Sequence, residues 1–491
     1  MDAYRPDLAG HTPVHFPDGR QFALTWSIPD DFGGMTSALL HRSRGFVRLA
    51  GKPVDILTFD ARTDYPALEQ QLRDRGELID GLGLINIWDW FRENDIAEDA
   101  PGSVDLERHE FTPLAADPAF VSGWRGDHEL TRTRADGDTT LQVDYYREDG
   151  SLLASDRRDT ANGRAIVLCD RTGTPIRSWG GAWAFYRFWL DVLRQRQPSF
   201  MIVDSKTVAN FMATYRRKRA VIVHVVHGTH LAGGALSASR RATFENLGAW
   251  DSVVLLTQRQ RADVEELLGV HRNLAVIGNG RDIESATESR DREVGKGIML
   301  ASLTARKRVD HAVRAVARAA AEHPGVSLDV YGDGPERERV AGAIAQLDAP
   351  VRLRGHVPDA KELLGDASFL LLTSSSEGLP LVLVEAMSAG CIPIAYDIPY
   401  GPADVIRHGR NGYLVPAGDP DAPAHAIAEL QSLTPRQVAR LRRHARRSAQ
   451  EFSDLAITRL WNHELRAAAS RKAAAWAAER RQATDRRERV G

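Results

Sequence analysis

Two glutamates in the second half of the chain have a spacing that would let both carboxylates bind groups beside one bound anion. Glu377 and Glu385 stand eight positions apart, and Gly378, Leu379 and Pro380 follow the first of them. The apolar spacing beyond Pro380 predicts a helix, which a proline can open because its missing N–H would have no partner there anyway. The N–H groups at the start of that helix would attract an anion, and the two carboxylates could hold hydroxyl groups on either side of it.

The same spacing also has a plainer explanation. A capping carboxylate followed by a solvated helix residue would place two glutamates at this distance, and for an isolated match that explanation is favoured. The function of the segment therefore depends on the elements around it.

Those elements alternate between strand-like and helical runs. A strand over 22–26 leads through a loop with Gly33 and Gly34 to a helix over 35–49 and a strand over 54–59, and a similar alternation runs from 298 to 415. Because a strand–helix–strand unit implies a parallel sheet, the sequence predicts an α/β fold with two Rossmann-like domains. The glycine pair lacks the spacing of a dinucleotide fingerprint, which disfavours a dehydrogenase.

The middle of the chain has a different pattern. Between about 104 and 179, polar and apolar residues alternate, and turn dipeptides recur at 136–137, 149–150, 162–163 and 172–173. This spacing is typical of β-hairpins. It predicts an antiparallel β-meander inserted in the first α/β domain, with exposed edges through which copies of the chain could associate.

These patterns divide the chain into five segments. The first Rossmann-like domain is predicted at 1–100 and 181–285, and the meander insert, assigned to acceptor binding or oligomerisation, lies at 101–180 between them. The second Rossmann-like domain is predicted at 286–450, and the polar stretch over 282–296, which spans its start, is predicted to be the linker between the domains. The last segment, 451–491, predicts a helix and a charged tail whose arginines form a solvated face.

Composition narrows the class of protein. A length of 491 residues exceeds what one core supports, and a formal net charge of −2 gives no general attraction to nucleic acid. Cys169 and Cys391 lie in apolar stretches and are expected to be buried free thiols in a reducing compartment. No apolar signal segment and no run of about 20 apolar residues occurs, so we expect a cytoplasmic protein, with contact at the inner face of the membrane left open.

The order of several short motifs makes a resemblance specific. The chain resembles the family 4 retaining glycosyltransferases, whose E-x7-E segment matches Glu377 to Glu385. The resemblance implies the GT-B fold, in which two Rossmann-like domains face a cleft. Within that family its pattern is similar to the wall-teichoic-acid, or poly(glycerol-phosphate), glycosyltransferases and to the accessory-Sec protein glycosyltransferases, which carry a β-meander insert. The resemblance covers about 26–452, and its other motifs lie at 227–230, 257–260, 278–280, 307–310, 331–335, 355–357, 396–402 and 411–415.

The resemblance implies three catalytic positions. Glu377 would bind a sugar hydroxyl near the reacting carbon, His227 would contact the donor sugar or the reaction centre, and Lys307 would neutralise the diphosphate. It also implies that Glu385 binds the ribose hydroxyls of the nucleotide. The amides of Gly378 and Leu379 would contact the donor sugar or its phosphate, and Pro380, which has no N–H, belongs to the same donor-binding segment.

The other implied donor contacts lie elsewhere in the chain. Gly33 and Gly34 would let the backbone approach the phosphates, and the nucleobase would lie against the backbone at His356 and Val357. Family members usually carry an arginine five positions before the lysine, where this chain has Ser302. Arg306 is the candidate that replaces this charge, although its side chain is expected to point elsewhere.

Together these roles imply a retaining, metal-independent hexosyltransferase. It would move a hexose or N-acetylhexosamine from a UDP-sugar, a substrate and not a cofactor, to a hydroxyl of a polyol-phosphate polymer of the wall-teichoic-acid type. A Ser/Thr O-glycosyltransferase of the accessory-Sec type and a non-catalytic donor-binding subunit remain as alternatives. No cofactor and no nucleic-acid partner are expected, and a homo-oligomer is expected through the meander.

Two patterns that suggest a metal site are disfavoured. His224, His227 and His230 straddle the end of a strand-like run, where positions three apart point to opposite faces. The Asp-Gly-Asp sequence at 136–138 resembles a metal-binding D-x-D motif but falls in a predicted hairpin turn.

Overall fold

The computed structural model describes residues 13–96, 104–106, 109, 111–158, 163–232, 234–283, 292 and 294–490, with side chains through 484. The chain divides into two compact units, Met1–Val223 with Ala468–Gly491, and His224–Ala467. Most of the predicted linker at 282–296, and Asn162 of one predicted turn, lie outside the described residues. The five-segment division of the chain stays a prediction.

The first unit begins with a parallel α/β arrangement. Strand β1 (Arg20–Leu24) pairs in parallel with β2 (Val54–Thr58) and with β10 (Ser199–Val203), and β2 pairs with β3 (Leu82–Asn86). Helix α1 (Gly34–Ala50) joins β1 to β2, and α2 (Tyr65–Asp74) joins β2 to β3. The predicted strand–helix–strand start is therefore confirmed. One detail was wrong, because Gly34 is the first residue of α1 and not part of the loop.

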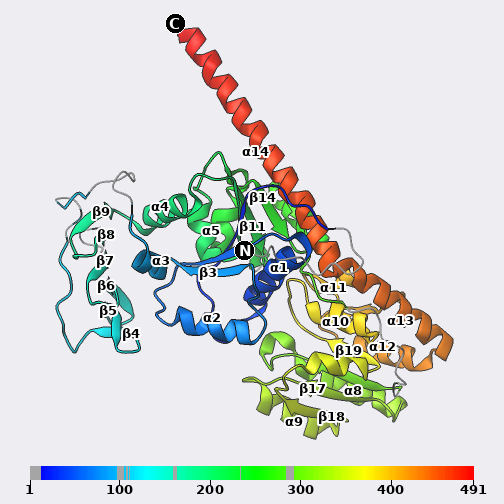
Figure 1. Ribbon diagram of the computed structural model, residues 1–491. Coiled ribbons are helices and arrows are strands. Elements are labelled where there is room, and N and C mark those ends of the chain that lie inside the picture. Colours follow the sequence, from blue (N-terminus) through cyan, green and yellow to red (C-terminus); the bar gives the residue numbers. More distant parts are fainter. Residues whose placement is uncertain are drawn as a thin grey trace. The chain divides into compact units, whose positions relative to one another are not determined.

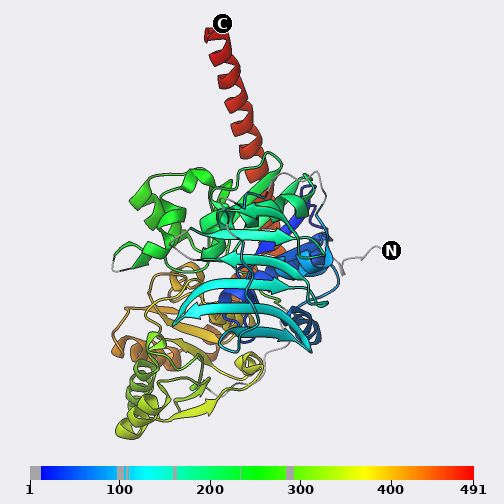
Figure 2. The ribbon, with the colours of Figure 1, turned by 90° about the vertical axis from the view of Figure 1, so that its left-hand side faces the viewer.

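The predicted antiparallel segment forms a six-stranded sheet, which Figure 2 shows face on in cyan. Consecutive strands are neighbours, and the predicted turns at 136–137, 149–150 and 172–173 lie between them. The turn at Gly126, between the first two strands, had no prediction. The strands are β4 (Val121–Arg125), β5 (His128–Asp136), β6 (Thr139–Tyr146), β7 (Leu152–Arg157), β8 (Ala165–Cys169) and β9 (Pro175–Trp179).

The meander is inserted between β3 and β10 in the chain. Helix α3 (Ile87–Glu93) precedes it and α4 (Ala182–Arg194) follows it. Trp88 of α3 stacks on Tyr145 of β6, with ring centroids 3.4 Å apart, so the meander is packed on the α/β part of the same unit.

The second unit contains a six-stranded parallel sheet in the order β18-β17-β16-β19-β20-β21 (Figure 1). The central strand β19 is buried along its whole length, as expected for a parallel sheet covered on both faces. The alternation of strands and helices predicted from 298 to 415 is confirmed by these strands and by α8, α9 and α10, whereas α12 and α13, beyond that range, had no prediction. The strands are β16 (Lys296–Leu300), β17 (Ser327–Tyr331), β18 (Val351–Gly355), β19 (Phe369–Leu372), β20 (Ile392–Tyr396) and β21 (Tyr413–Val415).

The helices of this unit are α8 (Val309–Glu322), α9 (Arg337–Leu347), α10 (Leu381–Ala389), α11 (Pro402–Val405), α12 (Asp421–Ser432) and α13 (Pro435–Ala449). Helix α8 buries residues spaced three and four apart, which gives it one apolar face. The chain runs outward from β16 to β18 and then returns to β19 on the other side of β16. Parallel sheets bind ligands at such a switch, beyond the carboxyl ends of the two strands.

The remaining elements complete both units. Strand β11 (Ala220–Val226) crosses the boundary between them, and in the second unit β14 (Ser252–Leu255) pairs in parallel with β15 (Leu274–Val276). Helix α14, in the segment 451–491 where a helix was predicted, spans Asp454–Val490. The others are α5 (Lys206–Met212), β12 (Leu231–Ala232), β13 (Ala235–Leu236), α6 (Ala238–Phe244) and α7 (Gln258–Leu268).

Two further sequence features have a structural counterpart. Cys169 in β8 and Cys391, which directly precedes β20, are buried and free, as predicted. Across the described residues, no helix has both the length and the apolar character needed to span a bilayer.

Candidate functional site

The loops that follow β16 and β19 meet at the switch point of the second unit. Lys307 Nζ lies 2.7 Å from Oε1 of Glu377, and Arg306 Nη1 lies 2.9 Å from the same oxygen. The backbone joins the two loops as well, since the N–H of Ser375 donates to the carbonyl of Arg306 at 2.8 Å. Strand order therefore brings together two motifs that are 70 positions apart.

Arg306 corrects one sequence prediction. Its side chain was expected to point away from the site, but it reaches Glu377 and also donates to the carbonyl of Ser376 at 2.8 Å. The arginine lies in a 3-10 turn, Ala305–Lys307, which places two consecutive cations on the same carboxylate.

The electrostatics of this cluster favour a bound anion. Burial alone would raise the pKa of Glu377. The charge and hydrogen bond of Lys307 and the charge of Arg306 lower the pKa by more than burial raises it, so the pKa lies below its usual value. Glu377 is therefore an anion held between two cations, and the three side chains carry one net positive charge. Because the Glu377 and Lys307 side chains are only 12% and 15% exposed, this charge is poorly screened by water.

The backbone amides beside Glu377 are available to a ligand. Pro380 was predicted to be the first residue of the helix. Helix α10 instead starts at Leu381, and Pro380 is its N-cap. Within the described residues, the N–H groups of Gly378 and Leu379 donate to no other group. They lie just before the N-terminus of α10 and next to two cations, which is an arrangement that suits a phosphate.

Two backbone hydrogen bonds join the 396–402 motif to this loop. The N–H of Glu377 donates to the carbonyl of Pro399 at 3.3 Å, and the N–H of Tyr400 donates back to the carbonyl of Glu377 at 3.0 Å. Gly401 has a φ of +105°, and a Cβ there would lie 2.4 Å from Cδ of Pro380. Only glycine fits, so this residue keeps the two segments in contact.

His227 follows β11 and contacts the same loop. Its carbonyl oxygen lies 3.3 Å from where a Cβ on Gly378 would stand, so a side chain at 378 would press on the His227 backbone. The next carbonyl, that of Gly228, accepts a hydrogen bond from Nε2 of Gln260 at 2.7 Å. The structure therefore brings three predicted catalytic positions, Glu377, Lys307 and His227, to one loop.

The second glutamate has a partner that the sequence did not indicate. Nε of Arg281 donates to Oε1 of Glu385 at 2.7 Å. Arg281 is itself fixed, because its N–H donates to the carbonyl of Phe452 at 2.9 Å and its carbonyl accepts from the N–H of Asp454 at 3.0 Å. The available signal was its position directly after the Gly-Asn-Gly motif at 278–280.

Arg240 is a second residue that sequence reasoning missed. This arginine of α6 is 8% exposed, and its Nη2 lies 3.9 Å from where a Cβ on Gly228 would stand. Burial lowers its pKa to about 10, and no hydrogen bond or ion pair to another described residue compensates its charge. Because burying an unpaired cation is unfavourable in free energy, an anion bound beside this side chain would stabilise it.

The three histidines once considered as metal ligands have separate surroundings. The His224 ring stacks on Trp250 at 5.0 Å, whereas the His230 ring stacks on Tyr400 at 5.9 Å. Among the described residues, no group of three His, Cys, Asp or Glu side chains has an arrangement that could hold a metal ion. In the sequence at 136–138, Asp136 ends β5, and Gly137 and Asp138 form the turn to β6.

Four predicted donor contacts are not part of this cluster of interactions. His356 and Val357 follow β18, where both are exposed. Gly33 and Gly34 lie at the N-terminus of α1 in the first unit, and a Cβ on either would meet nothing within 4 Å. Gly33 has a φ of −85°, so neither its conformation nor packing requires a glycine there.

Comparisons with known proteins agree with this geometry. Residues 281–451 match the family described as glycosyl transferases group 1, a range that includes Lys307, Glu377 and Glu385. Over 244 residues, or 48% of its length, the chain is 35% identical to an exopolysaccharide phosphotransferase of Streptomyces coelicolor, and this match spans 25% of that protein. The chain is 23% identical over 445 residues to a poly(ribitol-phosphate) alpha-N-acetylglucosaminyltransferase of Staphylococcus aureus, covering 80% of this chain and 89% of that protein.

Solved structures give the fold. The crystal structure of a Staphylococcus aureus TarM mutant with UDP, alpha-GlcNAc-glycerol and fondaparinux superposes with a TM-score of 0.67 at 21% identity, covering 91% of this chain and 100% of TarM. The pneumococcal O-GlcNAc transferase GtfA, in complex with UDP and GlcNAc, gives a TM-score of 0.64 at 20% identity, covering 93% of this chain and 99% of GtfA. The predicted GT-B fold, with parallel α/β sheets and an antiparallel insert, is thereby confirmed.

Proposed function

We propose that the protein is a glycosyltransferase that moves a hexose or N-acetylhexosamine from a UDP-sugar to a hydroxyl of a polyol-phosphate polymer. The observation that carries this proposal is the contact of Lys307 and Arg306 with Glu377 beside the open amides of Gly378 and Leu379. The fold is shared with two transferases whose crystal structures hold UDP. The relative from Staphylococcus aureus is named for a poly(ribitol-phosphate) acceptor.

Donor binding follows from the charges at the switch point. Lys307 and Arg306 would hold the diphosphate together with the two amides, and Glu385, fixed by Arg281, would accept hydrogen bonds from the ribose hydroxyls. The nucleobase would lie against the backbone at His356 and Val357. Gly33 and Gly34 would leave room for phosphate, which explains two glycines that their own surroundings do not require.

The lowered pKa of Glu377 argues against a role as a proton acceptor. A carboxylate held by two cations is a weak proton acceptor, so Glu377 is unsuited to act as a general base. It would instead hold a sugar hydroxyl close to the reacting carbon, opposite the loop of His227. Catalysis would then consist of positioning and of stabilising the negative charge on the departing UDP.

The transfer step is proposed to proceed with retention and without a metal ion. The bond between the anomeric carbon and the phosphate oxygen breaks while the bond to the acceptor oxygen forms on the same face of the sugar. The departing phosphate oxygen takes the proton of the acceptor hydroxyl. Lys307, Arg306 and the N-terminus of α10 would supply the positive charge that this leaving group needs.

Arg240 favours a polyol-phosphate over a peptide acceptor. Its buried and uncompensated charge lies beside Gly228, on the loop that also carries His227. A polyol-phosphate chain carries an anion for this side chain, whereas an unmodified Ser/Thr peptide does not. The peptide acceptor remains the second candidate because GtfA, an O-GlcNAc transferase, shares the fold.

Partners of other kinds are also part of the proposal. Self-association is proposed through strand β4 at the edge of the meander, where Val121 is 70% and Trp124 is 55% exposed. The cytoplasmic location stays a prediction.

The function is tested with a panel of donors and acceptors. Purified protein is incubated with UDP-glucose or UDP-N-acetylglucosamine and with poly(ribitol-phosphate), poly(glycerol-phosphate) or a Ser/Thr-rich peptide, and the products are weighed by mass spectrometry. We expect a gain of one hexose or N-acetylhexosamine mass on a polymer, absent with Glu377→Ala. No mass gain on any acceptor, with donor hydrolysis equally negligible in wild type and variant, would instead indicate a non-catalytic donor-binding subunit.

A further inference from the structure

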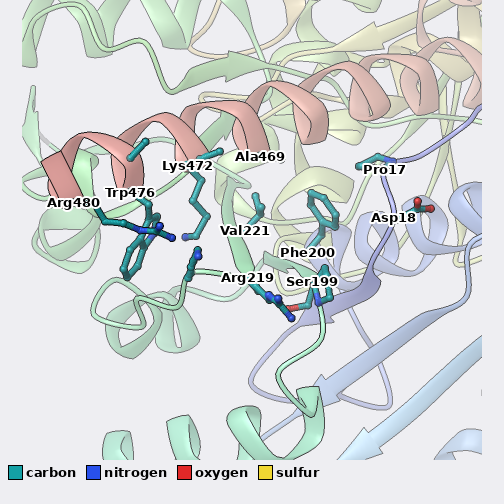
Figure 3. Close-up of a pocket in the computed structure, with 14 residues that line it drawn as sticks. Pro17, Asp18, Ser199, Phe200, Arg219, Val221, Ala469, Lys472, Trp476 and Arg480 are labelled. Atoms are coloured by element: carbon teal, nitrogen blue, oxygen red, sulfur yellow. The ribbon is translucent and has the colours of Figure 1, made fainter.

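A cavity of about 430 Å³ lies in the first unit between strands β10 and β11 and the last part of α14 (Figure 3). Its walls are mostly apolar. Figure 3 shows Lys472 and Trp476 extending from α14 on the side of the helix where Val221 and Phe200 also lie. The apolar lining is made by Pro17, Pro198, Phe200, Val221 and Trp476.

The lining of this cavity is also strongly basic. It includes Lys218, Arg219, Lys472 and Arg480, against one acidic residue, Asp18, which is fully exposed and faces Lys52 at 3.6 Å. Among the described residues, Lys218, Arg219 and Arg480 form no ion pair. The cavity therefore combines an apolar interior with an excess of positive charge.

The neighbouring arginines are already neutralised. The basic run 216–219 reads Arg-Arg-Lys-Arg, and its first two members pair with carboxylates, Arg216 with Glu479 at 2.9 Å and Arg217 with Asp191 at 2.5 Å. The pair with Glu479 also ties this run to α14. The two members without such a partner are the two that line the cavity.

This combination selects one class of ligand. A free phosphate or a polyol-phosphate chain would pair with the cations but has no apolar part to fill the cavity. A neutral apolar molecule would make no use of the positive charge of Lys218, Arg219 and Arg480, which are exposed. A lipid with an anionic head matches both features. A tryptophan beside basic residues is also typical of the boundary between lipid and water.

We propose that this cavity binds an anionic phospholipid at a membrane surface, with the headgroup on Lys218, Arg219 and Arg480. One acyl chain lies against Phe200, Val221 and Trp476. The site would hold the protein on the membrane. It belongs to the first unit, whereas Lys307 and Glu377 belong to the second, so the proposal does not depend on the sugar-transfer chemistry.

The first test measures binding of the full chain to vesicles by sedimentation. We expect binding to vesicles that contain phosphatidylglycerol and much weaker binding to pure phosphatidylcholine. Each lost cation should weaken binding to the anionic vesicles about fivefold, so Lys218→Ala with Arg219→Ala should weaken it about 30-fold. The matched control is Arg272→Ala with Arg314→Ala, two exposed arginines of the second unit, which should bind like the wild type.

The second test asks whether an acyl chain enters the cavity. Vesicles with bromine on the acyl chains quench tryptophan fluorescence on contact, so Trp476→Phe, which keeps an aromatic ring, should lose part of the quenching seen in the wild type. Equal quenching in both proteins overturns the proposal, and so does equal binding to neutral and anionic vesicles. If soluble poly(glycerol-phosphate) displaces the protein from vesicles, and Lys218→Ala with Arg219→Ala abolishes polymer binding, the site is a polymer site and the lipid proposal is wrong.

Discussion

Replacing Lys307 by methionine separates its two roles, as a partner of Glu377 and as a ligand of the leaving group. At 2.7 Å the Coulomb attraction in an effective dielectric of 20 is ~6 kcal/mol before desolvation is subtracted. Because Arg306 stays 2.9 Å from the same carboxylate, we expect a loss of only ~1–3 kcal/mol in the free energy of unfolding. Turnover should fall further, by ~10²–10³-fold, since a cation at the developing charge acts only in the transition state.

A double-mutant cycle with Glu377→Gln measures the first role. If the stability loss comes from the pair, Lys307→Met should cost much less in the Glu377→Gln background, as measured by urea unfolding. Binding of UDP, measured by calorimetry, reports the second role, and we expect Lys307→Met to weaken it in both backgrounds. Unchanged UDP binding together with lost stability would show that Lys307 serves the fold alone and would refute the assignment of a diphosphate ligand.

Three further outcomes follow from named contacts. Arg281→Ala should weaken UDP binding about 10-fold by releasing Glu385. The double variant with Glu385→Ala should bind UDP no more weakly than Glu385→Ala alone. Additive losses of affinity in calorimetry would contradict this coupling. Because the folded-state pKa of Glu377 lies below its ordinary value of 4.5, its contribution to stability is present above that value and lost as the pH falls through the folded value. The difference in urea midpoint between wild type and Glu377→Gln should therefore shrink from pH 6 to pH 3.5. A constant difference would contradict the lowered pKa of Glu377. Burial raises the pKa of Cys169 and Cys391 to about 12, so both thiols should react slowly with a disulfide reagent at pH 8 and quickly in urea; fast reaction of the native protein would contradict their burial.

Most helices and strands of both units could be predicted from local spacing. The run at 309–322 shows its apolar face in the sequence, and α8 has those bounds. The same holds for the run at 165–169, which is β8. Helix α13 was missed because its fifteen residues include six arginines, so few apolar residues mark its buried face.

The candidate site was predictable only in part. The loop of Glu377 and the N-terminus of α10 are local features, and their residues identified them. Arg306 was assigned the wrong direction because the orientation of a side chain depends on what lies across from it. Arg240 carried no signal, since its burial is a property of the packed protein and not of α6.

The sequence by itself determined which segments form helices and strands, and where an anion could meet a helix end, because these properties arise from neighbours within a few positions. Tertiary structure decided which loops meet. The return of the chain from β18 to β19 places Glu377 on Lys307 across 70 positions, and the path of the chain to α10 sets Arg281 on Glu385 across 104. Contacts over such separations depend on strand order and packing, which no local spacing records.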